Sequence, residues 1–314
     1  MDRNANKIVL VTQKSRLHEL LYKYNTKTQA KFQIEHLGAD FSDYILEDET
    51  YQKAFNDVKQ IADKYAKLTV VDREFLPNML FGKDDIVIAV GRDGLVCNTL
   101  KYLCGQKLIG VNPDPARWDG VLLPFEAGEL ERIIPQTITG DSNVRNVTMA
   151  KAVTNDGQEM LVVNDLFIGP KSHTSAQYDL TTRNTLGGVV TEEQSSSGII
   201  VSTGIGQTGW YKSVMAQAKA ACGLFGYDGS DDYEKIGWDE KKLSFVVREP
   251  FSSNTTDATV VFGTLNEGDP FRVLSKMPKK GVIFSDGMEE DAIEFNSGVE
   301  VSVGIAETKG CLVM

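Results

Sequence analysis

The sequence has few of the residues that build metal sites and disulfide frameworks. Its 314 residues include four cysteines and three histidines. The cysteines show no C-x-x-C spacing and no nearby histidine, so the sequence predicts neither a zinc site nor a disulfide framework. We therefore expect reduced cysteines, as in a cytosolic protein.

Long apolar runs and an excess of basic residues are also absent. No apolar run approaches the roughly 20 residues that span a membrane. The polar start, Met1 to Lys7, has neither an apolar signal region nor an Arg-rich transit pattern. The formal net charge of −11 argues against a nucleic-acid partner, but not against a nucleotide, because backbone amides and a divalent metal hold phosphates. We expect a cytoplasmic protein that binds neither membranes nor nucleic acid.

The chain is organised around a short apolar run that ends in a glycine turn, Ile86 to Gly94. Its first five residues are apolar and mostly β-branched, which is typical of a parallel strand covered on both faces. Ligands of open α/β sheets bind at the carboxyl ends of such strands. Gly91 and Gly94 let backbone N–H groups approach a phosphate, and Asp93 lies between them. Taken alone, this turn fits plain structure as well as a phosphate site.

Strands and helices alternate in the first part of the chain. Predicted strands at 8–12, 68–71, 86–90 and 107–112 are separated by helical patterns. This alternation predicts a Rossmann-like α/β domain with a mostly parallel sheet over residues 1–135. Beyond Pro135, helical periodicity nearly vanishes except at 211–223, and short strands are separated by turn residues. We expect a mainly antiparallel β-sandwich domain over residues 136–314.

Four features follow one another along the chain: the turn Gly91-Arg92-Asp93-Gly94, the pair Asn164-Asp165, the glycine-rich segment 203–210 and Ser213. In this order, they resemble motifs of the NAD kinase family. That family has a G-G-D-G turn in its α/β half, then an N-E pair and a glycine-rich T-x-x-G-S-T-A-Y segment in its β half. The resemblance covers most of the chain from Asp84 onward. Gly110 to Arg117 resembles the G-V-N-x-D-P-x-R motif of the mitochondrial-type branch.

The resemblance implies a kinase that transfers the γ-phosphate of ATP to the 2′-hydroxyl of the adenosine ribose of NAD, giving NADP. Mg²⁺ or another divalent ion would bridge the phosphates, and Asp93 would take the proton from the hydroxyl as general base. The family also implies a homodimer and a site in the cleft between the domains. By the same resemblance, Gly91, Arg92 and Gly94 would bind ATP phosphates, and Asn164, Asp165, Thr208, Gly209, Trp210 and Ser213 would bind NAD, with no metal ligand assigned to the chain.

Two departures from the family motifs leave alternatives open. Arg92 replaces the second glycine of the turn, and Asp165 replaces the glutamate of the N-E pair. If the glycine serves a positive φ, Arg92 is strained by about 1 kcal/mol or more. If it serves close approach to phosphate, the guanidinium either blocks that space or supplies positive charge. A surface role for Arg92, a turn role for Asp93 and a core role for Trp210 stay open.

The alternative functions are a nucleotide-binding NAD kinase homologue without activity, and a related kinase of another hydroxyl substrate, such as a lipid or a sugar. The altered turn motivates the first alternative. The second rests on related folds that share the G-G-D-G turn. A lipid kinase is expected to carry an apolar entrance or a membrane-binding helix, and the sequence shows neither pattern.

Overall fold

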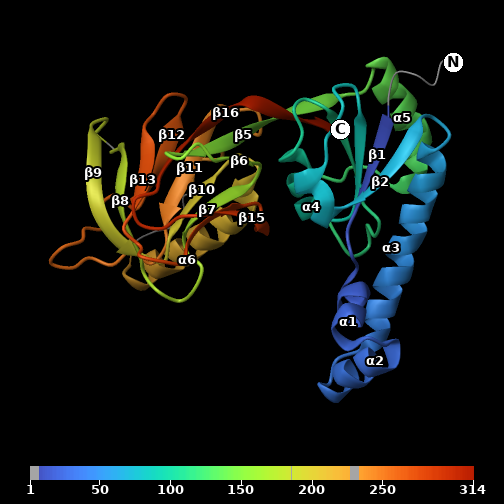
Figure 1. Cartoon of the computed structure of the whole chain (residues 1–314), viewed down its shortest axis with the longest axis horizontal. Coiled ribbons are helices and arrows are strands. Elements are labelled where there is room, and N and C mark those ends of the chain that lie inside the picture. The colour runs from blue at the N-terminus through green and yellow to red at the C-terminus, as the bar shows by residue number, and fades with distance from the viewer. Residues whose placement is uncertain (1–6, 185, 227–232) are drawn as a thin grey trace. The chain divides into compact units, whose positions relative to one another are not determined.

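The computed structural model describes residues 7–184, 186–226 and 233–314, and the chain folds into two compact units (Figure 1). The first unit comprises Met1–Arg145 with Cys311–Met314, and the second comprises Asn146–Gly310. The predicted division after residue 135 is therefore too early. Helix α5 (Leu130–Thr139) belongs to the first unit because Leu130, Ile133 and Ile134 pack into its core.

The first unit is an α/β domain built on a parallel sheet. Its strands run in the order β2-β1-β3-β4-β16, and each neighbouring pair is parallel. Strand β3 is buried along its whole length, as the sequence predicts. The bounds of these strands are β1 (Lys7–Thr12), β2 (Lys67–Asp72), β3 (Ile86–Val90), β4 (Lys107–Val111) and β16 (Glu300–Val313).

Helices flank this sheet. Helix α3 (Phe41–Ala62) packs on the sheet together with α5, and Figure 1 shows α4 (Asp93–Leu100) on the side opposite to α3. Helices α1 (Arg16–Tyr24) and α2 (Lys27–His36) pack on the first part of α3 around a small apolar cluster. The short 3₁₀ helices η1 (Arg73–Asn78) and η2 (Ala127–Glu129) lie in the connections.

The second unit contains two β-sheets with an apolar core between them. Tyr178, Phe245 and Phe271 are among its largest buried side chains. One sheet has the order β12-β11-β10-β7-β14-β15, with every neighbouring pair antiparallel. The bounds are β5 (Val144–Thr154), β6 (Glu159–Val162), β7 (Asp165–Pro170), β8 (Ala176–Arg183), β9 (Val189–Ser196), β10 (Ile199–Ser202), β11 (Lys242–Val247), β12 (Phe262–Asn266), β13 (Phe271–Ser275), β14 (Gly281–Ser285) and β15 (Met288–Glu294). The predicted fold class, an α/β domain followed by a mainly antiparallel β domain, is confirmed.

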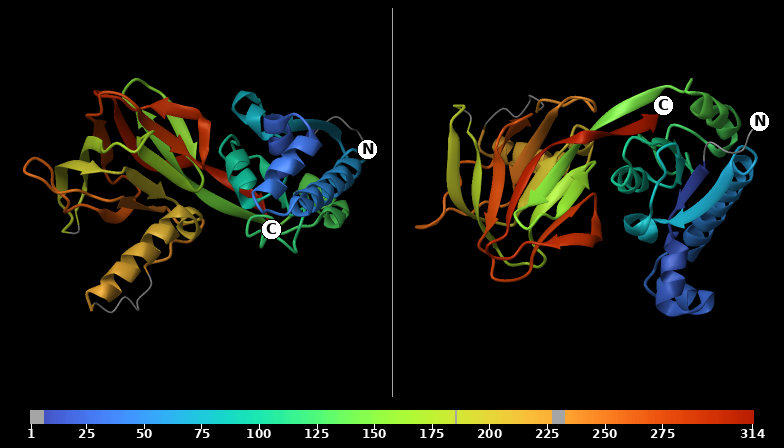
Figure 2. Two further views of the ribbon diagram at one scale, coloured as in Figure 1. Left: turned by 90° about the horizontal axis from the view of Figure 1, so that it is seen from below. Right: turned by 45° about the horizontal axis from the view of Figure 1, so that its top comes forward.

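Helix α6 (Trp210–Leu224) follows the 3₁₀ helix η3 (Gly206–Thr208) in the second unit. Its first residues pack on the sheet that contains β7 and β10, on the face away from the core. There Tyr211 contacts the apolar cluster around Phe167 and Ile200. Residues 216–224 are exposed, and Figure 2 shows the helix extending beyond the sheet. The helix predicted over 211–223 is thus confirmed. Of the helices that the structure describes, none is long and apolar enough to cross a membrane.

Candidate functional site

The strand order of the first unit creates a topological switch point between β1 and β3. From β1, the chain continues to β2 on one side, and later to β3 and β4 on the other side. The connections that leave the carboxyl ends of β1 and β3 therefore diverge, and open α/β sheets bind ligands in the crevice at such a point. The glycine turn that the sequence analysis singles out follows β3 and lies at this position.

Packing accounts for Gly91, the first residue of the turn. A Cβ at this position would lie 2.8 Å from Cδ2 of Leu95 and 3.2 Å from the side chain of Gln13. The Gly91 N–H donates to the carbonyl oxygen of Val111 at 3.2 Å. Gly94 lies exposed in the first turn of α4, and a Cβ there would meet no atom within 4 Å. A side chain at 91 would thus displace the ends of the Leu95 and Gln13 side chains, whereas the structure gives no steric reason for glycine at 94.

Arg92 has ordinary extended backbone and a partly exposed side chain that lies against Trp118 and Glu47. Its φ of −110° and ψ of 169° need no glycine, so the strain considered from the motif is absent. The guanidinium carbon lies 4.5 Å from the centroid of the Trp118 ring. Its Nη2 lies 3.4 Å from Oε1 of Glu47. Arg92 therefore contacts an aromatic ring and a buried carboxylate, and its contact with phosphate stays a prediction.

Asp93 begins helix α4, at the positive end of the helix dipole. The backbone N–H of Leu122 donates to its Oδ1 at 2.8 Å, so the loop after β4 fixes the carboxylate. The side chain is half-buried. Its place after β3 at the switch point is the one that the motif predicts. Its action as a base stays a prediction.

A small cavity lies between the two diverging connections. It is lined by Ser15 after β1, by Arg92 after β3, and by Glu47 and Trp118, among others. Its volume is about 20 Å³, which is room for about one water molecule. This cavity is therefore too small to hold a triphosphate as it stands.

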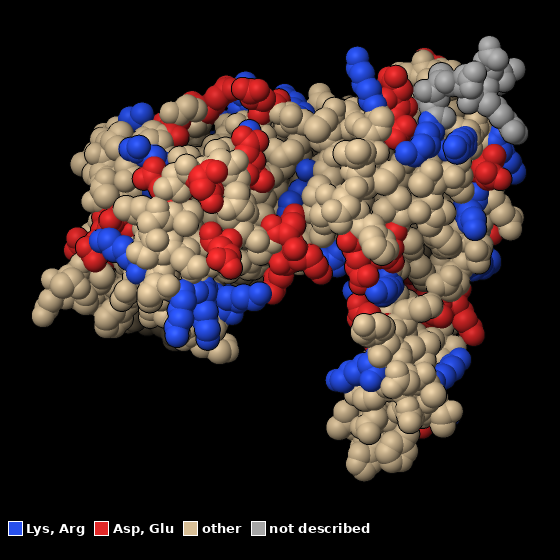
Figure 3. All heavy atoms as spheres, viewed as in Figure 1, with Lys and Arg blue, Asp and Glu red and all other residues tan. Residues whose placement is uncertain are grey.

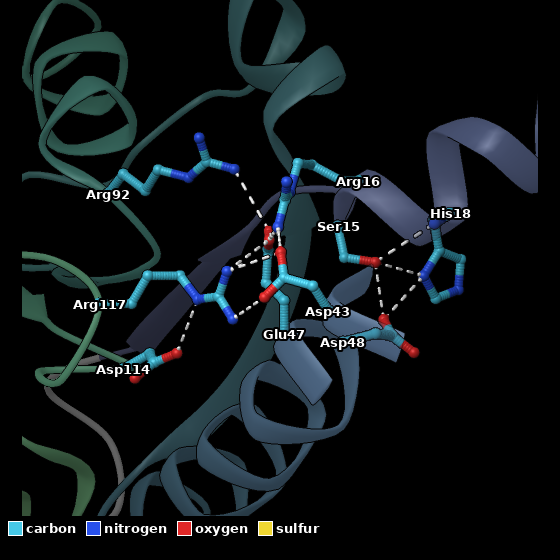
Figure 4. Close-up of polar contacts among 9 residues, drawn as sticks. All are labelled: Ser15, Arg16, His18, Asp43, Glu47, Asp48, Arg92, Asp114 and Arg117. Carbon is cyan, nitrogen blue, oxygen red and sulfur yellow. Dashed lines mark hydrogen bonds and ion pairs between the residues drawn. The ribbon is translucent and has the colours of Figure 1, made fainter. Parts of the chain in front are cut away.

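Figure 4 shows the ion pairs that surround this cavity. The Glu47 carboxylate forms ion pairs with Arg16, Arg92 and Arg117. These arginines lie in α1, in the β3–α4 turn and in the loop after β4. The Arg117 Nη2 also lies 2.7 Å from Oδ1 of Asp43. Hydrogen bonds from Arg117 and then Arg16 hold the pKa of Asp43 well below its usual range. The three arginines are thus paired with Asp43 and Glu47 of α3 and, for Arg117, also with Asp114 of the loop after β4.

A serine, a histidine and an aspartate lie together beside this cluster, but they do not form a nucleophilic triad. Ser15 Oγ donates to Oδ1 of Asp48 at 2.6 Å, and the His18 Nδ1 lies 3.1 Å from Ser15 Oγ and 3.2 Å from that same carboxylate oxygen. A triad needs one imidazole nitrogen on the serine and the other on the acid. Here the same nitrogen, His18 Nδ1, contacts both Ser15 and Asp48. The Ser15 hydroxyl also caps α1, because it accepts from the His18 backbone N–H.

In the second unit, the strand ladder brings the Asn164-Asp165 pair to the start of α6. Asp165 begins β7 and lies opposite Ser202, the last residue of β10. The Thr203 N–H donates to the Asn164 carbonyl oxygen at 3.0 Å. A Cβ on Gly206 would lie only 2.1 Å from that oxygen, so this glycine permits the close approach. Backbone hydrogen bonds therefore bring the Asn164-Asp165 pair next to the glycine-rich segment 203–210.

Burial gives Asp165 an unusual electrostatic environment. The Ser202 hydroxyl and the Trp210 backbone N–H act to lower the pKa of its carboxyl group. Burial, with a smaller contribution from the nearby Asp286, nevertheless raises the pKa of Asp165 to about 7. Within the described residues, Oδ1 of Asp165 and Oδ1 of Asn164 are buried and receive no hydrogen bond. Buried acceptors without donors are rare in folded proteins, so this pair of oxygens is a candidate ligand site.

The remaining residues of the predicted NAD site lie in η3 and α6. Trp210 is half-buried and stacks on Phe167, with ring centroids 5.5 Å apart, and the Arg248 guanidinium carbon lies 5.2 Å from its ring centroid. The Thr208 hydroxyl donates to the carbonyl oxygen of Ile205. Gly209 precedes Trp210, and Ser213 lies exposed about one turn further along α6. Trp210 thus contacts the apolar cluster and is also partly accessible.

Comparison with known proteins gives matches at the level of structure. Models of known families and curated proteins give no match. An NAD kinase from Archaeoglobus fulgidus, solved in complex with ATP, matches with a TM-score of 0.55 and 14% identity over 98% of this chain and 93% of that chain. The yeast NADH kinase, solved with NADH, matches with a TM-score of 0.58 and 12% identity over 99% of this chain and 84% of that one.

The chain has the fold of the NAD kinases. Within this fold, the predicted residues form two groups, each inside one unit. Gly91, Arg92, Asp93 and Gly94 lie together at the β1/β3 switch point. Asn164, Asp165, Gly209 and Trp210 lie together at the start of α6, with Thr208 in the preceding turn and Ser213 further along the helix.

Within the NAD kinase fold, three further residues support these groups and are missing from the sequence prediction. Glu47 and Trp118 contact Arg92. Asp286 fixes the turn before β7, because its carboxylate accepts from the backbone N–H groups of Val163 and Asn164. The turn-forming sequence Ser285-Asp286-Gly287 is a signal that points to Asp286, whereas no local pattern marks Glu47.

Proposed function

We propose that this protein is a phosphotransferase of the NAD kinase type. It would transfer the γ-phosphate of ATP to the 2′-hydroxyl of the adenosine ribose of NAD and release NADP and ADP. The observation that carries the proposal is the match of nearly the whole chain to two kinases of this fold, one solved with ATP and one with NADH. The G-R-D-G turn at the switch point and the Asn164-Asp165 pair support it.

Asp93 is the proposed general base. The Leu122 N–H fixes one of its carboxylate oxygens, so the carboxylate has a defined direction. A base oriented in this way accepts the proton of the attacking hydroxyl as the bond to phosphorus forms. Phosphoryl transfer depends mostly on positioning and charge neutralisation, and a carboxylate of defined direction at the switch point suits that requirement.

The proposed ribose contacts use the two orphaned oxygens. Oδ1 of Asn164 and Oδ1 of Asp165 are buried acceptors that lack a donor among the described residues. A ribose presents hydroxyl donors, so NAD would satisfy both atoms. Trp210 lies next to them and offers an aromatic surface to a ring of the dinucleotide.

Mg²⁺ would accompany ATP rather than occupy a site made by the chain. In the part of the chain that the structure describes, no three His, Cys, Asp or Glu residues form a group that could hold a metal ion. Mg²⁺ often binds through one or two carboxylates together with substrate phosphates and waters, so this arrangement fits the ion. Asp93 is the carboxylate at the turn, and bound Mg²⁺ would neutralise the phosphate charge.

The second candidate function is nucleotide binding without phosphoryl transfer. The cavity at the switch point holds about 20 Å³, and Arg92 fills the position that a glycine would leave open. If Arg92 and Trp118 do not move, this cavity has no room for a triphosphate. This candidate predicts binding of NAD with no turnover.

The purified protein tests the proposal directly. We expect NADP to form from NAD, ATP and Mg²⁺, detected by enzymatic cycling, and expect no NADP when ATP is omitted. Polyphosphate in place of ATP and NADH in place of NAD define the donor and acceptor. Tight NAD binding without NADP formation would support the second candidate, and an absence of both would refute both candidates.

A further inference from the structure

Glu47 is a buried carboxylate at the centre of three arginines. Its residue exposure is only 7%, although it lies on a helix whose neighbouring residues 46 and 49 are exposed. Arg16 makes the closest contact, Arg92 Nη2 lies 3.4 Å from Oε1, and Arg117 Nη1 lies 3.9 Å from Oε2. Figure 4 shows the three guanidinium groups converging on this side chain from different segments.

The formal charges of this cluster cancel. Arg16, Arg92 and Arg117 form ion pairs with Asp43, Glu47 and Asp114. Figure 3 likewise shows acidic and basic side chains next to one another on the visible face of the α1–α3 segment. An anionic ligand that approaches the switch point therefore meets a neutral group, unless one arginine exchanges its carboxylate for the ligand.

Arg92 is the arginine best placed for this exchange. Its side chain is 42% exposed, against 34% for Arg16 and 24% for Arg117. Its 3.4 Å contact with Glu47 is long for a charge-assisted hydrogen bond, which is usually 2.7–2.9 Å. If Arg92 leaves, Glu47 keeps Arg16 and Arg117, so the buried carboxylate does not become unpaired.

We propose that Glu47 is a positioning residue that holds Arg92 against Trp118 and competes with the ligand phosphate for its guanidinium. The inference rests on the proposed function and names the regulation of the same site. A triphosphate draws Arg92 from Glu47, because phosphate oxygens bind a guanidinium in the same paired geometry as a carboxylate. The movement also widens the cavity at the switch point, which Arg92 and Trp118 line. The Arg92 side chain then supplies positive charge to the bound phosphates at the G-R-D-G turn.

The test compares Glu47→Gln with wild type and with Glu49→Gln, an exposed change of equal charge on the same helix. Calorimetry measures the binding of ATP, of inorganic tripolyphosphate and of NAD. We expect Glu47→Gln to bind ATP and tripolyphosphate about three- to tenfold more tightly, since one negative charge near the phosphate is removed. NAD affinity and the behaviour of Glu49→Gln should match wild type. Where turnover is measurable, the KM for ATP should fall with little change in kcat.

The double variant Glu47→Gln/Arg92→Gln separates competition from a purely structural role. If Glu47 acts through Arg92, the gain in affinity disappears in the Arg92→Gln background. A structural role predicts instead a lower thermal midpoint with equal or weaker binding. Glu47→Asp, which keeps the charge, should bind tripolyphosphate nearly as wild type does.

The binding results test the role of Glu47, whereas NADP formation tests the proposed kinase function. Unchanged tripolyphosphate affinity in Glu47→Gln, or a gain that persists without Arg92, overturns the inference even if NADP is formed. No binding of tripolyphosphate or ATP to any variant also overturns it. Tighter tripolyphosphate binding without NADP formation supports the inference and refutes the kinase. If Glu47→Gln does not fold, Arg92→Gln alone decides: weaker tripolyphosphate binding supports the inference, and unchanged binding overturns it.

Discussion

The backbone N–H of Leu122 donates to Oδ1 of Asp93 at 2.8 Å and ties the loop after β4 to the start of α4. This bond gives the carboxylate a fixed direction at the switch point of the parallel sheet. An asparagine at position 93 could accept the same hydrogen bond through its amide oxygen. The charge of Asp93 can therefore be removed by this substitution while the Leu122 loop stays in place.

Asp93→Asn is expected to lower kcat by about 10²–10⁴-fold, the usual contribution of general acid–base catalysis. NAD affinity should change far less, because the amide keeps its size and still accepts the Leu122 N–H. The thermal midpoint should hold or rise. Steady-state kinetics and NAD calorimetry on both proteins give the answer, with the exposed Asp119→Asn as the control. A variant with the wild-type kcat would exclude Asp93 as the base.

NAD or NADP at saturation is expected to raise the thermal midpoint. A ligand that binds only the folded state stabilises it, by about 2.7 kcal/mol at a concentration of 100 times Kd. Asn164→Ala removes one of the orphaned oxygens and should reduce this shift, whereas the exposed Asn254→Ala should not. Thermal scans with NAD, NADP and ATP measure the shifts. Equal midpoints with and without all three ligands would refute the nucleotide site.

Asp165 predicts a specific pH dependence of stability. Its pKa in the folded protein is raised to about 7, above the ~3.9 of an unfolded aspartate. The folded state thus binds more protons between these values, and the contribution of Asp165 to the free energy of unfolding falls as the pH rises from about 4 through 7. Asp165→Asn has no carboxyl group at this position and does not lose this stability. The free energy of unfolding of the variant, relative to that of wild type, should therefore increase as the pH rises. Urea unfolding at pH 5, 6, 7 and 8 measures it, and a constant difference would contradict the shift.

Gly206→Ala is expected to destabilise the second unit by about 1–3 kcal/mol or more. The added Cβ would meet the Asn164 carbonyl oxygen at 2.1 Å, and that carbonyl is held in place by the Thr203 N–H. NAD affinity should fall with stability, because the turn that carries Asn164 and Asp165 must shift. Gly223→Ala, in open space on α6, serves as the control and should stabilise by about 0.5–1 kcal/mol. Similar unfolding curves for the two variants would show that the close approach at Gly206 is unimportant.

Local patterns were sufficient to predict the main strands and the turn. The apolar run Ile86 to Val90 predicts β3 because a strand buried on both faces cannot alternate polar and apolar residues. The change to antiparallel sheets was predicted from turn spacing, and α6 from its periodicity. Helix α2 was missed, and its sequence shows little separation of apolar and polar faces, with Ala30 as its buried residue.

Contacts between distant segments explain what sequence reasoning missed. Glu47 lies 45 positions from Arg92, and nothing in its helix distinguishes it from the exposed acid at 49. Asp165 was predicted as a ligand residue, but its pKa depends on Ser202, Trp210 and Asp286, which only the folded sheet brings near. The division after 135 was wrong because α5 contains Pro135 and still packs on the first sheet.

The parallel pairing of Cys311, Leu312 and Val313 with Lys107, Leu108 and Ile109 has a consequence for synthesis on the ribosome. The sheet of the first unit stays incomplete until residues up to 313 have emerged, although its other strands end by residue 111. Until then residues 107–109 of β4 present an open hydrogen-bonding edge, which is prone to wrong pairing with other chains. A fragment ending near residue 145 should therefore aggregate more readily than the intact chain, and supplying the segment 311–314 as a separate peptide should lessen that aggregation.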